Sequence, residues 1–196
     1  MLPRYAELQR TEAAYVEEHR SAGVPDLRTI ELPPRYEELV QQPLPLDDDE
    51  HAWLRRFGTT FAELCEQLLL PPTIQHDDLH MNNVYDGGGH LRVLDWGDAS
   101  IGHPYFSLFE TFRFLEEVAH LSPRSDWLRR LTDVYLEAWP RDERDDFETA
   151  LTVAGFAHAI AWLRQRRHLE VAEHEQFDRA FARVLRRAID RAEHPT

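Results

Sequence analysis

Apolar side chains recur at α-helical spacing on both sides of one short non-helical interval, and this pattern constrains the fold most. Before the interval, we expect a helix near residues 4–21, a short one opened by Pro33 and Pro34, and a third from the acidic residues 47–50 to Leu70. After Pro104, apolar stripes predict four more helices, around residues 108–115, 127–135, 147–158 and 177–185. We interpret these stripes as faces that pack into a core.

The interval between the two helical regions indicates short strands and polar loops. It begins after Pro71 and Pro72 with an extended piece at residues 73–75, and a polar stretch follows. Two short runs, residues 84–85 and 91–94, then flank a glycine-rich turn at 86–89, which is typical of a hairpin. The predicted fold class is therefore mainly α with one small β-ribbon, an α+β fold.

The length of 196 residues favours a single domain spanning 1–196. Within it we expect a helical lead-in over 1–70, loops carried on a β-hairpin over 71–104, and a helical part over 105–196. The longest aliphatic run, residues 68–70, is far shorter than the ~18 residues of a membrane span, so no membrane is expected as partner. The first residues lack the apolar segment of a secretory signal, and Cys65 is the only cysteine, so we expect a cytoplasmic location.

The charge balance excludes one class of partner and one type of catalytic group. The chain has 22 basic and 36 acidic residues, a formal net charge of −14, so it lacks the basic surface that tracks phosphates and no nucleic acid is expected as partner. All the basic residues are arginine. Any mechanism in which this chain supplies a lysine is therefore excluded.

The polar stretch has the residue order of a phosphoryl-transfer loop. Residues 76–83 fit H-x-D-L-x-x-x-N, the spacing in which an aspartate accepts a hydroxyl proton and an asparagine holds a metal ion. Asp95-Trp96-Gly97 follows the hairpin and fits D-F-G with tryptophan in place of phenylalanine. Mg²⁺ prefers one or two carboxylates together with substrate phosphates, and the two loops supply that set. We expect Asp78, Asn83 and Asp95 to converge in space.

The sequence HDDLHMNNVY followed by VLDWGDASIGHP resembles the aminoglycoside phosphotransferase and choline kinase-like superfamily, over about residues 74–108. The resemblance implies the C-terminal lobe of a protein-kinase-like fold, with ATP or GTP and Mg²⁺ as cofactors. It implies that Asp78 is the catalytic aspartate, that Asn83 and Asp95 bind Mg²⁺, and that His76 braces the loop from behind. His80 and Asp98 also match the pattern, His80 more simply as a packing residue and Asp98 as a residue that could cap the loop.

Three departures from the family pattern stand out. Asp77 replaces a glycine and adds a carboxylate beside Asp78, and Ser107 replaces an aspartate that could tether the loop. The third departure is that no G-x-G-x-x-G motif occurs and no lysine is present, so the nucleotide-covering N-lobe is absent from this chain. We therefore expect a partner lobe, in cis or in trans, for a phosphotransferase that is incomplete alone. A catalytically inactive binding module derived from the fold is the alternative.

Two further interpretations of the polar stretch remain open. Asp78 and Asn83 could serve only as turn formers whose side chains bond their own backbone. Alternatively, the His76-Asp77 dipeptide with His80 and Asp95 could form the divalent-metal site of a helical phosphohydrolase.

The sequence says less about the chemical identity of the acceptor molecule than about the two loops. The resemblance implies a small-molecule hydroxyl acceptor held by the helices after the second loop. Those helices and the segments that lead into them carry aromatic and acidic residues. These residues could bind a cationic acceptor, or they could simply form core and solvated surface. These residues are Tyr105, Phe106, Trp127, Trp139, Trp162, Asp142, Glu143, Asp145 and Asp146.

Overall fold

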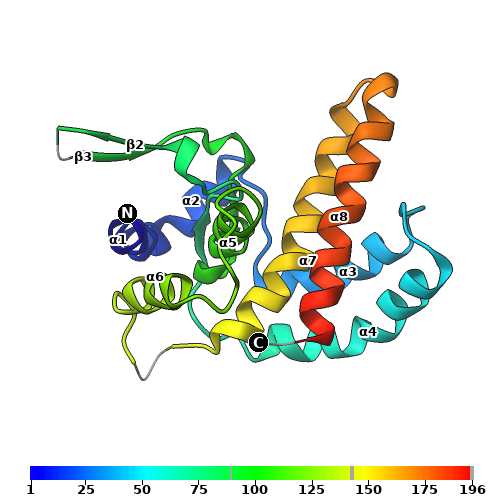
Figure 1. Cartoon of the computed structure of the whole chain (residues 1–196), viewed down its shortest axis with the longest axis horizontal. Helices are drawn as coiled ribbons and strands as arrows, with labels where there is room; N and C mark the ends of the chain where they lie inside the picture. The colour runs from blue at the N-terminus through cyan, green and yellow to red at the C-terminus, as the bar shows by residue number, and fades with distance from the viewer. Residues whose placement is uncertain (89, 142–143, 195–196) are drawn as a thin grey trace.

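The computed structural model describes residues 1–88, 90–141 and 144–194, most of them helical. Figure 1 shows the helices together with a two-stranded hairpin that projects from one edge of the molecule. The helices are α1 (Leu2–Glu12), α2 (Val16–Ser21), α3 (Leu32–Val40), α4 (Asp48–Glu66), α5 (Ser107–Glu117), α6 (Asp126–Leu136), α7 (Phe147–Gln165) and α8 (His174–Glu193). The strands are β1 (Thr73–Gln75), β2 (Val84–Gly87), β3 (His90–Val93) and β4 (Ser100–Gly102). The expectation of a mainly helical α+β chain is confirmed.

Helix α7 lies at the centre of the helical part. It packs against α3, α4, α5 and α8, and residues on several of its sides are buried, among them Val153, Phe156 and Ile160. Figure 1 shows α7 and α8 side by side along much of their length. A Cβ added at Gly155 would lie 3.0 Å from Ala188 and 3.1 Å from Phe109, so glycine permits this close packing.

The N-terminal helices differ from the sequence expectation at two points. The helix expected near 4–21 is interrupted by a 3₁₀ turn at Ala13–Tyr15, which separates α1 from α2. The third helix starts as expected, with a capping box between Asp47 and Glu50, but α4 ends at Glu66 rather than at Leu70. The amides of Leu69 and Leu70 instead donate to the carboxylate of Asp145, which takes this segment out of the helix.

The chain forms two small antiparallel sheets rather than the one ribbon that was expected. Strands β2 and β3 make the predicted hairpin, with Val84 opposite Val93 and pairing that continues to Gly87 opposite His90. The hairpin turn is therefore shorter than residues 86–89, and Gly89 itself lies outside the described residues. Strand β1 pairs with β4, an element that the sequence did not indicate.

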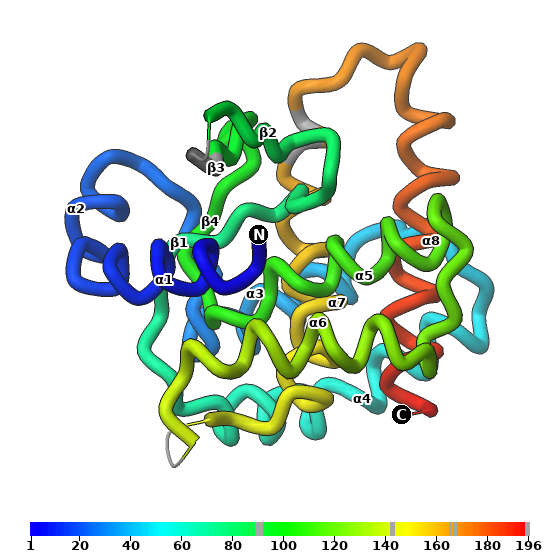
Figure 2. Tube along the Cα trace, turned by 60° about the vertical axis from the view of Figure 1, so that its left-hand side comes forward, coloured from blue at the N-terminus to red at the C-terminus, as the bar shows by residue number. Residues whose placement is uncertain are grey.

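The second sheet determines where the polar loops begin and end. Gln75 at the end of β1 lies opposite Ser100 at the start of β4, so the β1–β4 ladder closes the base of the excursion formed by residues 76–99. Helix α1 packs against β1, as Figure 2 shows, and the segment after α2 adds a bridge from Asp26 to Ile101. Within the described residues, no helix is long and apolar enough to cross a membrane.

Candidate active site

His76 connects the two polar loops. Its ring Nδ1 accepts a hydrogen bond from the Asp78 amide, so Nε2 carries the proton and donates to the carbonyl of Leu94 at 2.7 Å. The ring also makes an edge contact with the Trp96 ring, with centroids 4.9 Å apart. His76 is buried and lies behind the loop, so it is placed to orient residues rather than to meet a ligand.

Asp78 has one carboxylate oxygen held by the protein. Its Oδ2 accepts a hydrogen bond from Asn83 Nδ2 at 3.0 Å and lies 3.2 Å from His80 Nε2. His80 Nδ1 accepts from the Asn82 amide, and the His80 ring stacks on Phe114 with centroids 4.7 Å apart. Because the Asp78 side chain is 41% exposed and the described contacts engage Oδ2, Oδ1 is the oxygen that an incoming hydroxyl can reach.

The amide of Asn83 has a fixed orientation. Its Nδ2 donates both to the Asp78 carbonyl at 2.9 Å and to Asp78 Oδ2, so the opposite orientation would place oxygen against two oxygens. The Asn83 side-chain oxygen therefore points away from Asp78. The Asn83 carbonyl accepts from the Leu94 amide at 2.8 Å, which joins this loop to the residue before Asp95.

Asp95 follows that anchored residue in a conformation that is unusual for its type. It is exposed and has φ 62° and ψ 62°, the left-handed region that few residues other than glycine adopt. Such a residue persists where its surroundings fix the backbone, and here Leu94 is held by both His76 and Asn83. The structure thus brings Asp78 and Asn83 into contact and joins Asp95 to them through Leu94.

The oxygen ligands in these loops suit Mg²⁺ rather than a histidine-bound metal. Asn83 can offer its side-chain oxygen and Asp95 its carboxylate, and nucleotide phosphates would complete the oxygen set that Mg²⁺ prefers. Both ring nitrogens of His76 are engaged by the protein. Across the described ranges, no group of three or more His, Cys, Asp and Glu residues could hold a metal ion. With both ring nitrogens hydrogen-bonded, His76 is not free in this geometry to act as the ligand that the phosphohydrolase interpretation requires.

Asp77, beside the loop, is half-buried. Its pKa is raised from 3.8 to about 7: burial is the main cause, the carboxylates of Asp98 and Glu110 contribute to the rise, and a hydrogen bond with Ser100 opposes it. Its Oδ2 is buried without a hydrogen-bond partner among the described residues. Asp77 and Asp98 both line a cavity of about 280 Å³. Since φ at Asp77 is not positive, this backbone does not require the glycine of the family pattern.

The loop is tethered despite the serine at position 107. The His76 amide donates to Tyr5 Oη at 3.0 Å and to Ser107 Oγ at 3.1 Å, and these two hydroxyls lie 2.7 Å apart. Ser107 Oγ in turn donates to Gln75 Oε1 at 2.8 Å. Sequence reasoning missed Tyr5, because a contact across 71 positions leaves no local signal.

The residues considered for a cationic acceptor have mostly structural roles. Asp145 accepts from His103 Nε2 at 2.7 Å as well as from the Leu69 and Leu70 amides, and these bonds lower its pKa although burial opposes them. Asp146 caps α7. Tyr105, Phe106 and Trp139 are buried, Trp162 is half-buried and Trp127 is exposed, while Asp142 and Glu143 lie outside the described residues.

The mainly helical fold and the two paired loops agree with the protein-kinase-like superfamily. The sequence model of the phosphotransferase enzyme family matches residues 2–142, and the chain belongs to this family. No curated protein matches the chain significantly.

Two solved structures have a similar fold. A choline/ethanolamine kinase family protein from Mesorhizobium loti superposes with a TM-score of 0.56 at 18% identity. A candidate aminoglycoside phosphotransferase from Ralstonia eutropha gives a TM-score of 0.52 at 15% identity. Each match covers 98% of this chain and 65% of the other, so the chain spans less than two thirds of these relatives.

Proposed function

We propose that the chain is the catalytic-loop lobe of a cytoplasmic kinase that transfers the γ-phosphoryl group of ATP or GTP to a hydroxyl of a small molecule. The observation that carries the proposal is the Asp78 carboxylate, held through Oδ2 by Asn83 with Oδ1 left accessible. Membership of the phosphotransferase enzyme family supports it. Neither nucleic acid nor a membrane is needed as a partner for this reaction.

Each residue of the loops has a defined part in the proposed reaction. Asp78 Oδ1 accepts the acceptor's hydroxyl proton as that oxygen bonds to the γ-phosphorus, the bond to the β–γ bridging oxygen breaks, and the nucleoside diphosphate leaves. Asn83 and Asp95 would hold Mg²⁺, which neutralises phosphate charge. His76 and His80 are positioning residues, since they contact the loop and Asp78 rather than the reacting atoms.

We further propose that a nucleotide-covering lobe, in cis or in trans, completes the site. In kinases a glycine-rich loop and a lysine hold the nucleotide opposite the metal-binding loops, and this chain has neither. Exposed apolar side chains at and beside the hairpin, Met81, Tyr85 and Leu94, support a surface for such a lobe.

The test measures nucleotide consumption with ATP and GTP, Mg²⁺, and a panel of aminoglycosides, choline, sugar alcohols and hydroxy acids. The isolated chain is expected to bind Mg²⁺-nucleotide weakly without appreciable turnover, whereas a protein joined to its nucleotide-covering lobe is active. Asp78→Ala in the joined protein should lower the rate roughly 10²- to 10⁴-fold. Full turnover by the 196-residue chain alone would overturn the need for a second lobe. An inactive joined protein would favour the binding-module alternative.

A further inference from the structure

We propose that this chain recognises its acceptor through an anionic group, a carboxylate or a phosphate, bound between Arg35 and Arg164. The inference rests on the proposed function, because it names the class of molecule that receives the phosphoryl group. It differs from the cationic acceptor that the sequence analysis left open as one possibility. The site lies between α3, which carries Arg35, and α7, which carries Arg164.

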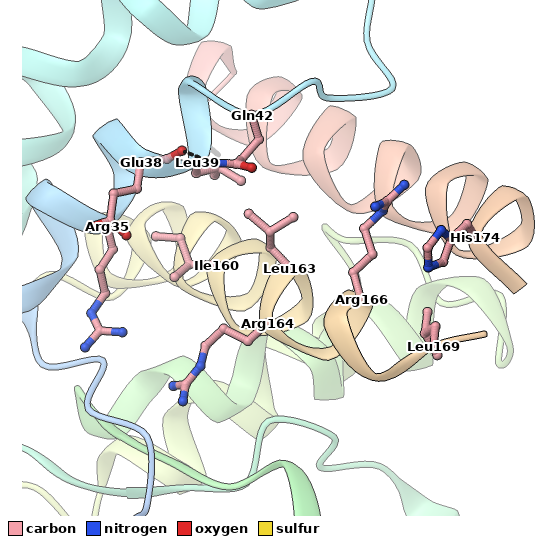
Figure 3. A pocket seen from close by; sticks show the side chains of 10 residues that line it. All are labelled: Arg35, Glu38, Leu39, Gln42, Ile160, Leu163, Arg164, Arg166, Leu169 and His174. Carbon is pink, nitrogen blue, oxygen red and sulfur yellow. Dashed lines mark hydrogen bonds between the residues drawn. The ribbon is translucent and has the colours of Figure 1, made fainter. Parts of the chain in front are cut away.

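The two arginines line one cavity of about 500 Å³. Figure 3 shows their guanidinium groups extending from α3 and α7 toward the same side of this pocket, beyond the apolar side chain of Ile160. A third arginine of the pocket, Arg166, is bonded to both carboxylate oxygens of Asp178 at 2.8 and 3.1 Å, so its charge is compensated. Arg35 and Arg164 make no ion pair or side-chain hydrogen bond with any residue that the structure describes.

The two arginines have no protein partner among the described residues although the chain is acidic. With a net charge of −14, carboxylates are abundant, and several arginines bind them, as Arg186 binds Glu50. Glu38 also lines the pocket and follows Arg35 by one helical turn, a spacing at which ion pairs form, yet no such bond is formed. Both guanidinium groups line the same cavity and extend toward the same side of it. A carboxylate or phosphate would bind both through charge-assisted hydrogen bonds.

Arg164 also connects this pocket to the catalytic loops. It lines the second cavity, of about 280 Å³, together with Asp77, Gly97 and Asp98. That cavity is bounded by the residue directly before Asp78 and by residues just after Asp95, so it adjoins both catalytic loops.

The test measures binding to the full chain, without nucleotide, by isothermal titration calorimetry. The probes are glycerate and glycerol 3-phosphate, which carry both a hydroxyl and an anionic group, with glycerol as the neutral probe, choline as the cationic probe and inorganic phosphate as the bare anion. We expect both anionic alcohols to bind more tightly than glycerol and choline. Arg35→Gln and Arg164→Gln should each weaken that binding by about tenfold or more, the loss expected for one charge-assisted contact.

A matched control variant and a separate measurement of ATP binding distinguish the possible outcomes. Arg55→Gln removes an exposed arginine of α4 that lines neither cavity, and it should leave binding unchanged, with circular dichroism as the check on folding of all three variants. The proposal is overturned if neither anionic alcohol binds, if choline binds more tightly, or if Arg164→Gln binds like the wild type. It is also overturned if the arginine variants weaken ATP binding alone, because the pair would then serve nucleotide phosphates. Since binding is read without turnover, an inactive kinase would not mask the result.

Discussion

The carboxyl of Asp77 is the group through which pH should affect stability. Its pKa is about 7 in the folded chain and 3.8 when unperturbed. The folded state therefore favours the protonated carboxyl, and this contribution is complete below pH 3.8 and is lost as pH rises through 7. The shift corresponds to roughly 4 kcal/mol. We predict that the free energy of unfolding, measured by urea denaturation in EDTA, falls over this range in the wild type relative to Asp77→Asn.

The Asp77→Asn variant is the internal control because it keeps the shape of the side chain but cannot ionise. Subtracting the free energy of unfolding of the variant from that of the wild type cancels the contribution of other titrating groups. One such group is the buried His103, whose pKa is lowered by burial. Parallel stability curves for the two proteins between pH 4 and pH 7 would show that Asp77 ionises without penalty.

Asp95 permits a second test, because its backbone conformation and its carboxylate have separable effects. Asp95→Gly should raise the free energy of unfolding by up to about 1 kcal/mol, since glycine adopts the left-handed conformation without strain. Asp95→Asn should leave stability nearly unchanged, because asparagine tolerates this conformation as aspartate does. Both variants should lose the Mg²⁺ dependence of nucleotide binding, measured by calorimetry. Retained Mg²⁺ dependence in Asp95→Asn would exclude Asp95 as a metal ligand.

At the scale of elements, the loop after β1 is attached to both α1 and α5 by hydrogen bonds that can substitute for each other. The His76 amide is bonded to two hydroxyls, those of Tyr5 and Ser107, so either one alone still satisfies it. We predict that Tyr5→Phe and Ser107→Ala each lower the free energy of unfolding by about 1 kcal/mol, and that the double variant loses about 1 kcal/mol more than their sum. Urea denaturation of the four proteins measures this coupling, and strictly additive losses would contradict it.

The elements also show what a sequence can and cannot predict. Long amphipathic helices were predictable because apolar residues repeat at their period, as in α8. The hairpin was predictable from its glycine-rich turn. Strand β4 was not predictable, because its three residues, one of them Gly102, are too few to show alternation. Its pairing with β1 also depends on tertiary contacts rather than on local sequence. The loop residues Asp78 and Asn83 were found from their spacing, whereas Arg35 and Arg164 meet only in the folded chain.

At the scale of the whole molecule, the exposed apolar residues near the hairpin predict self-association of the isolated chain. Met81 and Tyr85 are each 61% exposed and Leu94 is 51% exposed. A surface meant to be covered by another lobe should associate when uncovered. The Tyr85→Ser, Leu94→Ser double variant should therefore shift sedimentation toward monomer in analytical ultracentrifugation.

A variant at another exposed apolar position controls for general solubility. Val171→Ser changes a residue that is 83% exposed and lies outside the hairpin region, so it should sediment like the wild type. A wild-type chain that is monomeric at every concentration, or an equal shift in the control, would count against an uncovered docking surface.

The β1–β4 ladder has a consequence for how such a molecule can change over evolution. Every residue assigned here to the reaction lies on the single excursion of residues 76–99, whose ends are held side by side at Gln75 and Ser100. The arginines assigned to recognition come from α3 and α7 instead. The excursion can thus be inherited as one unit together with the hydroxyls of Tyr5 and Ser107 that hold it, while the helices that carry the arginines diversify toward new acceptors.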